Sequence, residues 1–270
     1  MDASAAKPTI IVVSSHVADG SVGGRLQAFV LERLGFPVVF APTVTLPWHP
    51  GRGPGTQIVP PMLAFADSLA DLARAPWLGE VGGILSGYLA DATQANSIAE
   101  LVVAAREANE ALLYLCDPVL ADHDGAYRPP SVVAAIRDRL MPRADNATPN
   151  RHELALLMGQ RPTDNAALVG LARRSGAAEI VVTSAFAEEG QIANLLIRPK
   201  DAFSAVHAAL PEAPHGTGDF FAALYLAHRL GGDEIAEALD RALNTTLHFV
   251  ELAQGRDGLP LVAHQAMLFE

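Results

Sequence analysis

Short apolar runs rich in β-branched residues alternate with helical segments along almost the whole chain, and this alternation limits the possible fold more than any other feature. Apolar runs bounded by turn residues are typical of strands that helices cover on both faces. Strands joined by right-handed helical crossovers form a mostly parallel sheet between two helical layers. The sequence therefore predicts an α/β fold, a three-layer α/β/α sandwich with a mostly parallel central sheet, formed by residues 1–270 as a single domain.

The individual elements follow from periodicity and from the residues that begin and end helices. The predicted buried strands are residues 10–14, 37–40, 83–85, 112–116 and 179–183, with short antiparallel edge strands within 188–199 and 203–208. The predicted helices are residues 25–34, 91–109, 219–230 and 233–253, with one more that Thr148-Pro149 would open and Gly159 would close. Three prolines and three glycines in residues 43–57 predict a long loop, a feature that is usually functional in a compact domain.

Composition narrows the class of protein. The chain has 270 residues, of which 50% are hydrophobic and 18% charged, and this excludes a disordered chain. A net charge of −11 and the lack of a basic stripe disfavour nucleic-acid binding, because neutralising phosphates needs clustered cations. Cys116 is the only cysteine, which excludes an internal disulfide and indicates a reducing, cytoplasmic location; its apolar run predicts an inert core residue. No targeting segment or membrane span is expected, since the first apolar run covers only residues 9–13.

The most informative motif is HGTGD at residues 215–219, which is followed at once by an apolar helical segment. Two glycines allow the backbone to approach a ligand closely, and the first-turn amides of the helix point outward at the positive end of its dipole. That geometry binds an anion such as a transferring phosphoryl group. Asp219 would lie beside the anion and could take a proton from an attacking hydroxyl. An aspartate cap on a glycine turn would give the same pattern.

Three weaker signals fall at strand ends or helix starts, where an open α/β sheet places its ligands. Asp117 directly follows an apolar strand and suits a metal–nucleotide complex, although an ordinary strand-end turn explains the residue better when it is taken alone. Asn150 and Glu153 share one face of a first helical turn, where an acidic residue also simply favours the helix dipole. The stretch from Ser14 to Gly23 combines strand-end hydroxyls with a glycine turn, which fits either a polar substrate or a plain connection.

Together these motifs resemble those of the pyridoxal kinases in the ribokinase-like superfamily. The resemblance extends over nearly the whole chain and is carried by the segments SSHVADGSVGGR, LERLGFPV, ILSGYLADATQ, YLCDPVLAD, ATPNRHELALLMG and HGTGDFFAALYLAHRL. It implies a homodimeric kinase that transfers the γ-phosphoryl group of ATP to the 5′-hydroxymethyl group of pyridoxal, with pyridoxine and pyridoxamine as further substrates, in vitamin B6 salvage. It also implies Mg²⁺ and leaves a monovalent cation as a further candidate.

The resemblance assigns roles to individual residues. Asp219 would be the catalytic base, and Gly216, Thr217 and Gly218 would form the anion hole for the β- and γ-phosphates. The expected ATP-binding residues are Asp117, Thr148, Asn150, Glu153, Thr183 and Ser184, with Asp117 and Glu153 facing the metal through water. The expected substrate contacts are Ser15, Val22, Thr43, Tyr88 and Asp219. The expected lid residues are Asp122 and Tyr127.

The sequence departs from the family pattern mainly where the substrate would bind. Pro50 stands where a threonine usually follows a histidine, so one hydrogen bond to a ring substituent is not available. Gly24 and Ala121 replace a usual asparagine and a usual glycine, and Ser184 stands where some relatives have a lysine. These departures affect the choice of substrate more than the type of reaction. The loop at 43–57 is expected to act as a flap, in which a large apolar side chain covers either the substrate or a partner subunit.

Two other functions stay open from the residues alone. One is a hydroxymethylpyrimidine kinase or another ribokinase-like small-molecule kinase. The other is a non-catalytic vitamer-binding protein of the same fold, which the intact Asp219 and glycine turn disfavour because binding alone needs no base. The preferred vitamer, the need for a monovalent cation and the dimer geometry do not follow from the sequence.

Overall fold

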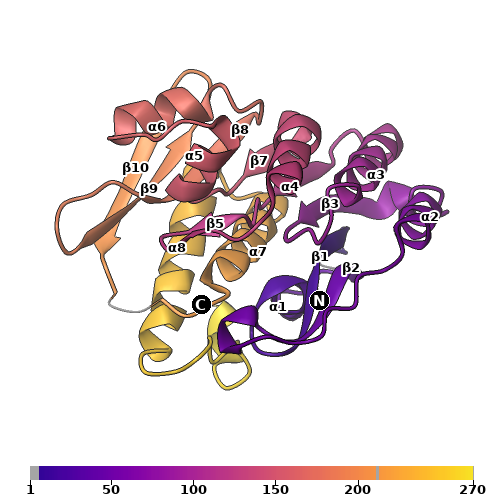
Figure 1. Cartoon of the computed structure of the whole chain (residues 1–270), viewed down its shortest axis with the longest axis horizontal. Helices are drawn as coiled ribbons and strands as arrows, with labels where there is room; N and C mark the ends of the chain where they lie inside the picture. Colours follow the sequence, from indigo (N-terminus) through magenta and orange to yellow (C-terminus); the bar gives the residue numbers. More distant parts are fainter. Residues whose placement is uncertain (1–5, 211–212, 270) are drawn as a thin grey trace.

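The computed structural model describes residues 6–210 and 213–269, which build one twisted sheet between two helical layers (Figure 1). The described sheet has eight strands in the order β10-β9-β8-β7-β4-β3-β1-β2. Neighbours from β2 to β8 are parallel, whereas β8, β9 and β10 pair antiparallel. The strands are β1 Thr9–Asp19, β2 Val38–Trp48, β3 Val81–Ser86, β4 Leu113–Cys116, β7 Asn146–Ala147, β8 Glu179–Ala185, β9 Gln191–Ile197 and β10 Ala202–Ala208. The predicted sandwich and its antiparallel edge are confirmed.

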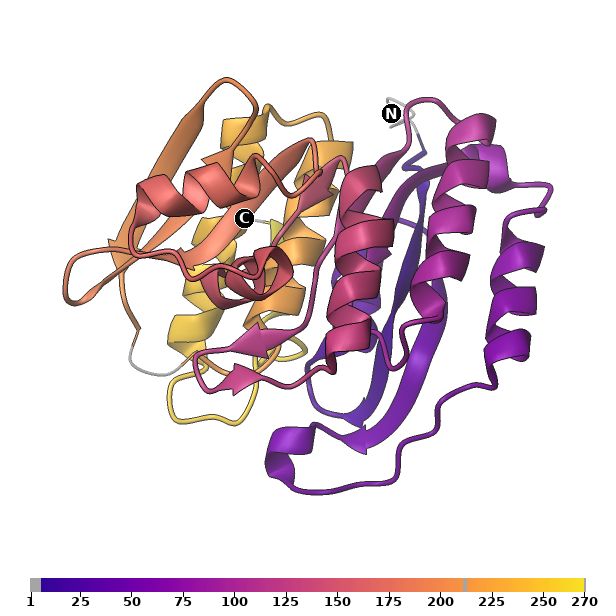
Figure 2. The ribbon, with the colours of Figure 1, turned by 45° about the horizontal axis from the view of Figure 1, so that its top comes forward.

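Helices cover both faces of this sheet (Figures 1 and 2). One face carries α2 Met62–Leu72, α3 Gln94–Ala108, α4 Pro130–Ala135, α5 Arg151–Met158 and α6 Asn165–Ala172, and the other carries α1 Gly23–Arg33, α7 Thr217–Leu230 and α8 Ile235–Leu252. A separate small hairpin consists of β5 Ala121–Asp122 and β6 Gly125–Ala126. Short 3₁₀ or π turns occupy η1 Pro50–Arg52, η2 Leu78–Glu80, η3 Ile136–Leu140, η4 Met141–Arg143 and η5 Gln265–Phe269.

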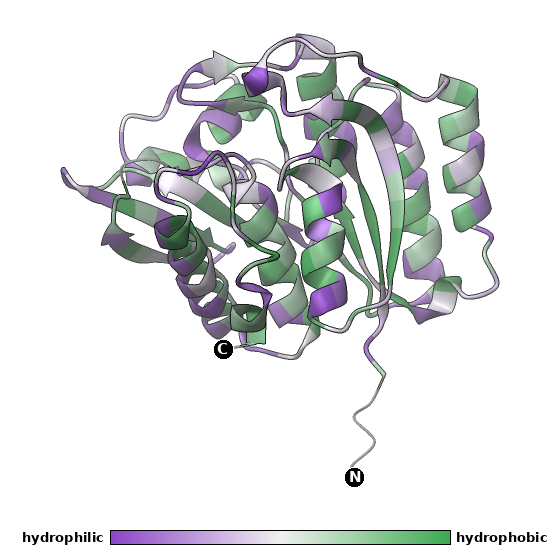
Figure 3. Cartoon of the chain, turned by 90° about the horizontal axis from the view of Figure 1, so that it is seen from below, coloured by the Kyte–Doolittle hydropathy of each residue, from purple (hydrophilic) through white to green (hydrophobic). Residues whose placement is uncertain are grey.

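The sheet divides the hydrophobic core in two. In β1, Ile11 and Val13 face one core while Ile10 and Val12 face the other, and all four are completely buried. Alternate residues of a strand point to opposite faces, so an unbroken apolar run can serve both cores. Figure 3 shows these apolar strands enclosed by helices that carry polar residues. No helix in the described residues combines the length and apolar character that crossing a membrane requires.

Strands β1 and β2 are longer than predicted. The predicted loop at 43–57 is wrong in its first part, because residues 43–48 belong to β2. β1 continues to Asp19, and β2 runs parallel to it as far as Trp48. Because β2 is an edge strand, its backbone N–H groups are not all needed by a neighbour, and a proline such as Pro47 is tolerated there. Only residues 49–57 lie beyond the strand, and we call these residues the flap.

The chain order reverses at β1, because β2 lies on one side of it and β3 on the other. Ligands of open α/β sheets bind beyond the carboxyl ends of the strands at such a point. Figure 2 shows the β5–β6 hairpin and the η1 turn of the flap on this same side of the molecule. The fold therefore predicts a ligand site at this edge of the sheet, beyond the carboxyl ends of the strands.

Candidate active site

Helix α7 begins at this edge with a glycine turn that the backbone requires. Gly216 is the residue before the helix and has a φ of 89°, a conformation that strains other residues. A Cβ atom there would lie 2.2 Å from the carbonyl oxygen of Ser21. By contrast, a Cβ atom on Gly218 would meet nothing within 4 Å. The protein itself therefore needs Gly216, whereas it leaves open space beside Gly218.

Asp219 lies on the first turn of α7 and has an enclosed carboxylate. One oxygen, Oδ2, accepts a hydrogen bond of 2.8 Å from the backbone N–H of Gly23 at the start of α1. The other oxygen, Oδ1, is buried and has no partner among the described residues. Burial raises the pKa of Asp219 to about 6, against the opposing effect of the Gly23 hydrogen bond. At neutral pH this carboxylate is ionised and has one oxygen free to accept a proton.

Asp117 follows β4 directly and lies close enough to Asp219 to interact with it electrostatically. Its carboxylate accepts a hydrogen bond of 3.0 Å from the hydroxyl of Thr148, a residue that follows β7. Burial, together with the negative charge of Asp219, raises the pKa of Asp117 to about 8. Of the two acids, Asp219 thus ionises first as the pH rises. No cationic side chain is among the groups that shift the pKa of Asp117.

Asn150 and Glu153 act together, as predicted, but as the cap of α5. The Asn150 side chain accepts hydrogen bonds of 2.9 Å from the N–H groups of His152 and Glu153. The Glu153 carboxylate accepts one hydrogen bond of 2.8 Å from the Asn150 N–H and another of 3.0 Å from the Leu120 N–H, so both its oxygens have backbone partners. Burial, with a further contribution from Asp117, raises the pKa of Glu153 well above its usual range. The expectation that Thr148 caps this helix is wrong.

Thr183 and Ser184 lie at the carboxyl end of β8, where the strand bulges. Thr183 pairs with Asn150 through an isolated parallel bridge, which places β8 beside the start of α5. Ser184 has a φ of 52°, the only left-handed non-glycine residue in the described chain. Such a backbone costs on the order of 1–3 kcal/mol and is found mostly at functional sites. This corner of the sheet edge is where the sequence predicted nucleotide contacts.

The predicted substrate residues surround a small apolar cluster beside β1. The cluster consists of Val17, Val22, Val44 and Leu46, with Tyr88 and Ala90 packed against it. The hydroxyl of Thr43 donates to the Tyr88 carbonyl at 2.7 Å, and the Ser14 hydroxyl accepts from the Tyr88 N–H at 3.1 Å. Ser15 lies in β1 and is buried. The structure thus brings Ser15, Val22, Thr43 and Tyr88 to one region.

The predicted lid residues lie on the β5–β6 hairpin and the residue that follows it. We call residues 121–127 the lid. The Tyr127 N–H donates to the Leu120 carbonyl at 3.1 Å, which closes the base of the lid. Partial burial and the charges of Glu153, Asp117 and Asp219 raise the pKa of Tyr127. The lid therefore lies over the same acidic groups that the sheet edge presents.

The flap lies against the turn that precedes α7. The rings of His49 and His215 stack with their centroids 4.0 Å apart. Arg52 forms ion pairs of 2.7 Å with both Asp19 and Asp257. These contacts hold the flap beside the predicted anion hole.

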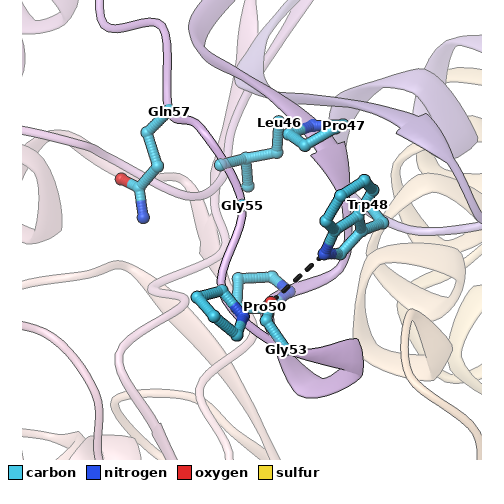
Figure 4. Close-up of a pocket in the computed structure, with 8 residues that line it drawn as sticks. Leu46, Pro47, Trp48, Pro50, Gly53, Gly55 and Gln57 are labelled. Carbon is cyan, nitrogen blue, oxygen red and sulfur yellow. Dashed lines mark hydrogen bonds between the residues drawn. The ribbon is translucent and has the colours of Figure 1, made fainter.

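Trp48 precedes the flap and packs on it. Its indole N–H donates to the Gly53 carbonyl at 3.2 Å, as Figure 4 shows. The ring lies beside a shallow hollow lined by Leu46, Pro47 and Pro50 among others. Trp48 is nevertheless 39% exposed, so part of the indole surface can contact another molecule.

Sequence reasoning missed two residues that organise the site, Gln94 and Arg128, and it did not show what Ser14, in the stretch that it singled out, would bind. The Gln94 side chain donates to the Thr43 carbonyl at 2.8 Å, and the Ser14 hydroxyl binds the Tyr88 backbone. Arg128, directly after the lid, binds the hydroxyl of Tyr88. Only the position of Arg128 next to Tyr127 is a usable signal in the sequence. Cys116 is buried and its pKa is raised to about 12 by burial, in accordance with the prediction that it is inert.

A helix that begins with a glycine turn and a pair of buried carboxylates at the same sheet edge suit the transfer of a phosphoryl group to a small hydroxyl-bearing molecule. Combined with the observed sheet topology, they place the chain in the ribokinase-like class of kinases.

Comparisons with known proteins identify the family. Residues 81–257 match the family described as phosphomethylpyrimidine kinase. A pyridoxal kinase of Rubrobacter xylanophilus is 33% identical over 96% of this chain and 93% of its own length. A pyridoxine/pyridoxal/pyridoxamine kinase of Bordetella bronchiseptica is 33% identical over 90% of this chain and 88% of its own. The pyridoxal kinase from Leishmania donovani, solved in complex with ADP and pyridoxine, superposes with a TM-score of 0.90 at 24% identity, covering 97% of this chain and 95% of that one. This chain belongs to the pyridoxal kinase family.

Proposed function

We propose that this protein is an ATP-dependent kinase that phosphorylates the 5′-hydroxymethyl group of pyridoxal, and of pyridoxine and pyridoxamine, in vitamin B6 salvage. The observation that carries the proposal is the free, enclosed Oδ1 of Asp219 at the head of α7. A carboxylate that only capped the helix would not need to be buried. Here burial disfavours the ionised form and raises the pKa to about 6.

The proposed reaction needs one proton acceptor and one anion site. The substrate hydroxyl would give its proton to Asp219 while its oxygen forms a bond to the γ-phosphorus of ATP. The bond from the γ-phosphorus to the β,γ-bridging oxygen breaks, and ADP leaves with that oxygen. The first-turn amide of Gly218 would face the phosphate oxygens, on which negative charge is spread during transfer. The Thr217 N–H donates to the Pro214 carbonyl at a long 3.4 Å and would have to leave it to join the anion hole.

The donor set fits Mg²⁺. Asp117 and Glu153 are buried carboxylates with raised pKa values, and hard divalent cations prefer oxygen ligands. We assign Asp117 the closer position, because among the described residues only the Thr148 hydroxyl donates to its carboxylate, whereas both oxygens of Glu153 have backbone donors. Glu153 would then act through water. The cation would neutralise phosphate charge when bound. Thr183 and Ser184 would line the nucleotide on the far side of Asn150.

The vitamer would lie on the apolar cluster beside β1. Tyr88 and Val22 offer flat and branched surfaces for a pyridine ring, and the buried hydroxyl of Ser15 offers a hydrogen bond. The ring would then lie between the proposed anion site and the flap. Pro50 lies in the flap. The threonine hydroxyl that is usual at this position would contact a ring substituent and not the 5′-hydroxymethyl group.

A homodimer and a cytoplasmic location complete the proposal. Ile58, Val59, Met62 and Leu63 lie next to one another in sequence, close to the edge strand β2, and are 43–72% exposed. A second copy of the chain would cover them, and sedimentation of the purified protein tests this. A cytoplasmic location, where thiols stay reduced, suits a chain whose single cysteine is buried and unpaired.

A hydroxymethylpyrimidine kinase is the second candidate, because the matching family region covers residues 81–257 and leaves out Ser15, Val22 and Thr43. The test is a coupled ADP-release assay over pyridoxal, pyridoxine, pyridoxamine and hydroxymethylpyrimidine. The expected result is turnover with the B6 vitamers that Asp219→Asn abolishes and Asp240→Asn, an exposed control on α8, leaves intact. Turnover only with hydroxymethylpyrimidine would select the second candidate, and vitamer binding without any ADP release would indicate a binding protein.

A further inference from the structure

The residue that follows the lid makes an unusual set of contacts with the expected ring platform of the substrate pocket. Arg128 donates from Nη1 to the Tyr88 hydroxyl at 2.7 Å and from Nη2 to the Ala90 carbonyl at 2.7 Å. Its guanidinium also lies 4.6 Å from the centroid of the Tyr88 ring. The third donor, Nε, is enclosed and has no acceptor among the described residues. One hydrogen bond and a cation–π contact thus join Arg128 to Tyr88, and a second hydrogen bond joins it to the backbone two residues further on.

Tyr88 has little freedom apart from this contact. Its backbone N–H and carbonyl are held by Ser14 and Thr43, and its ring packs on the apolar cluster beside β1. The outer end of the ring, the hydroxyl, is bound by Arg128. The direction in which the ring faces therefore depends on where Arg128 lies.

The lid, by contrast, has few anchors. Residues 123–127 are exposed, and the hairpin strands are two residues each. The Tyr127 N–H bond to Leu120 and the Asn150 side-chain bond to the Ala121 carbonyl hold its two ends. Tyr127 faces the acidic nucleotide side, and the next residue in the chain, Arg128, faces Tyr88. One peptide bond separates the two sides of the site.

We propose that Arg128 is a positioning residue that couples the nucleotide lid to the vitamer pocket, so that each substrate increases the affinity for the other. The inference rests on the proposed function, because it names the regulation of that same site. A nucleotide that orders the lid also orders Arg128 and hence Tyr88, and by reciprocity a vitamer on Tyr88 orders the lid. Couplings between sites are typically about 5- to 150-fold in affinity, and for this single clamp we expect about tenfold.

The test measures the dissociation constant of pyridoxal by calorimetry, with and without saturating AMP-PNP and Mg²⁺. The wild-type chain should bind pyridoxal about tenfold more tightly when AMP-PNP is present. In Arg128→Met this ratio should fall close to one, while AMP-PNP alone binds nearly as in the wild type. Arg128→Lys should recover part of the ratio, because an ammonium group can stay over the ring but cannot make both hydrogen bonds. Tyr88→Phe should also lower the ratio, since it removes the hydroxyl that Arg128 binds.

The matched control is Arg137→Met, which removes an arginine paired only with Asp138 on the surface of η3 and should keep the wild-type ratio. A purely structural role of Arg128 would weaken both ligands equally and leave the ratio at its wild-type value. That result, or a ratio near one in the wild type, would overturn the coupling while leaving the kinase proposal intact. A wild-type chain that binds neither pyridoxal nor AMP-PNP would overturn the proposed function, and the coupling with it.

Discussion

Gly218→Ala separates the two explanations of the HGTGD motif, a ligand site and a plain helix cap. In the folded chain a Cβ atom on Gly218 meets no other atom within 4 Å, and its φ is not left-handed. The substitution is therefore free of internal clashes. Alanine is favoured over glycine in a helix by about 0.5–1 kcal/mol. For a domain of roughly this size, that corresponds to a rise in Tm of at most about 2–4 °C.

The same methyl group would stand among the amides that we assign to the phosphates. A displacement of the phosphoryl group by about 1 Å can cost roughly 10²-fold in rate. We therefore expect kcat/KM for ATP to fall by about 10²-fold, or about 2.7 kcal/mol of transition-state stabilisation, while the Tm stays equal or rises. A coupled ADP-release assay and thermal unfolding measure the two quantities on the same protein sample.

Two further glycine variants control this experiment. Gly170→Ala, in α6, adds a methyl group whose nearest neighbour is an arginine nitrogen at 4.0 Å, and it should leave turnover unchanged. Gly216→Ala forces a φ of 89° on alanine and places Cβ 2.2 Å from a backbone oxygen, so it should lower the Tm clearly. If Gly218→Ala keeps the wild-type kcat/KM for ATP, no phosphate binds against this turn and the motif is only a cap.

Four more predictions follow from the acids and from Trp48 beside the flap. Asp219→Asn should lower kcat by about 10²–10⁴-fold. In the wild-type chain the folded-state pKa of Asp219, about 6, exceeds the usual 3.8, so the chain loses stability as the pH rises through 6. The variant lacks this ionisation and should therefore have a higher free energy of unfolding than the wild type at pH 8 but not at pH 4. The base must be ionised, so wild-type kcat/KM should fall at least tenfold per pH unit below pH 6, and a flat profile down to pH 4.5 would exclude Asp219 as the base. Glu153→Gln should raise the Mg²⁺ concentration that gives half-maximal rate more than it raises KM for the vitamer, and an unchanged Mg²⁺ titration would remove Glu153 from the metal site. Trp48→Ala should raise KM for the vitamer and change the ranking of vitamers while KM for ATP stays nearly the same; a variant that sediments as a monomer and binds vitamer normally would make Trp48 an interface residue instead.

Features that depend on local sequence could be predicted well. The apolar runs of β1, β4 and β8 and the buried helix α7 follow from residues next to one another, and so do Asp117 and Asp219 at the ends of these elements. The sequence pattern places the start of α5 two residues early, because Thr148-Pro149 also fits a helix start. Asn150 caps instead, since its side chain forms reciprocal hydrogen bonds with Glu153, and the Thr148 hydroxyl is engaged by Asp117.

Features that depend on contacts between distant residues could not be predicted. The end of β2 has the composition of a loop because its prolines are tolerated only on an edge strand, and the strand order is not visible in the sequence. Arg128 and Tyr88 are separated by 40 residues, and Gln94 and Thr43 by 51. No local pattern marks either pair, since each forms only when β2, β3 and the lid come together. The organisation of the substrate pocket is therefore a result of the tertiary structure.

The position of the transferred phosphate tests the central claim most directly. The purified chain is incubated with pyridoxal, ATP and Mg²⁺, and the product is examined by phosphorus–proton correlation NMR, with Asp219→Asn as the control. Our account predicts one phosphorylated vitamer per ADP released, with the phosphorus coupled to the 5′-methylene protons, and at least about a hundredfold less product from the variant in the same time. ATP hydrolysis to free phosphate without a phosphorylated vitamer, or equal product from Asp219→Asn, would contradict it.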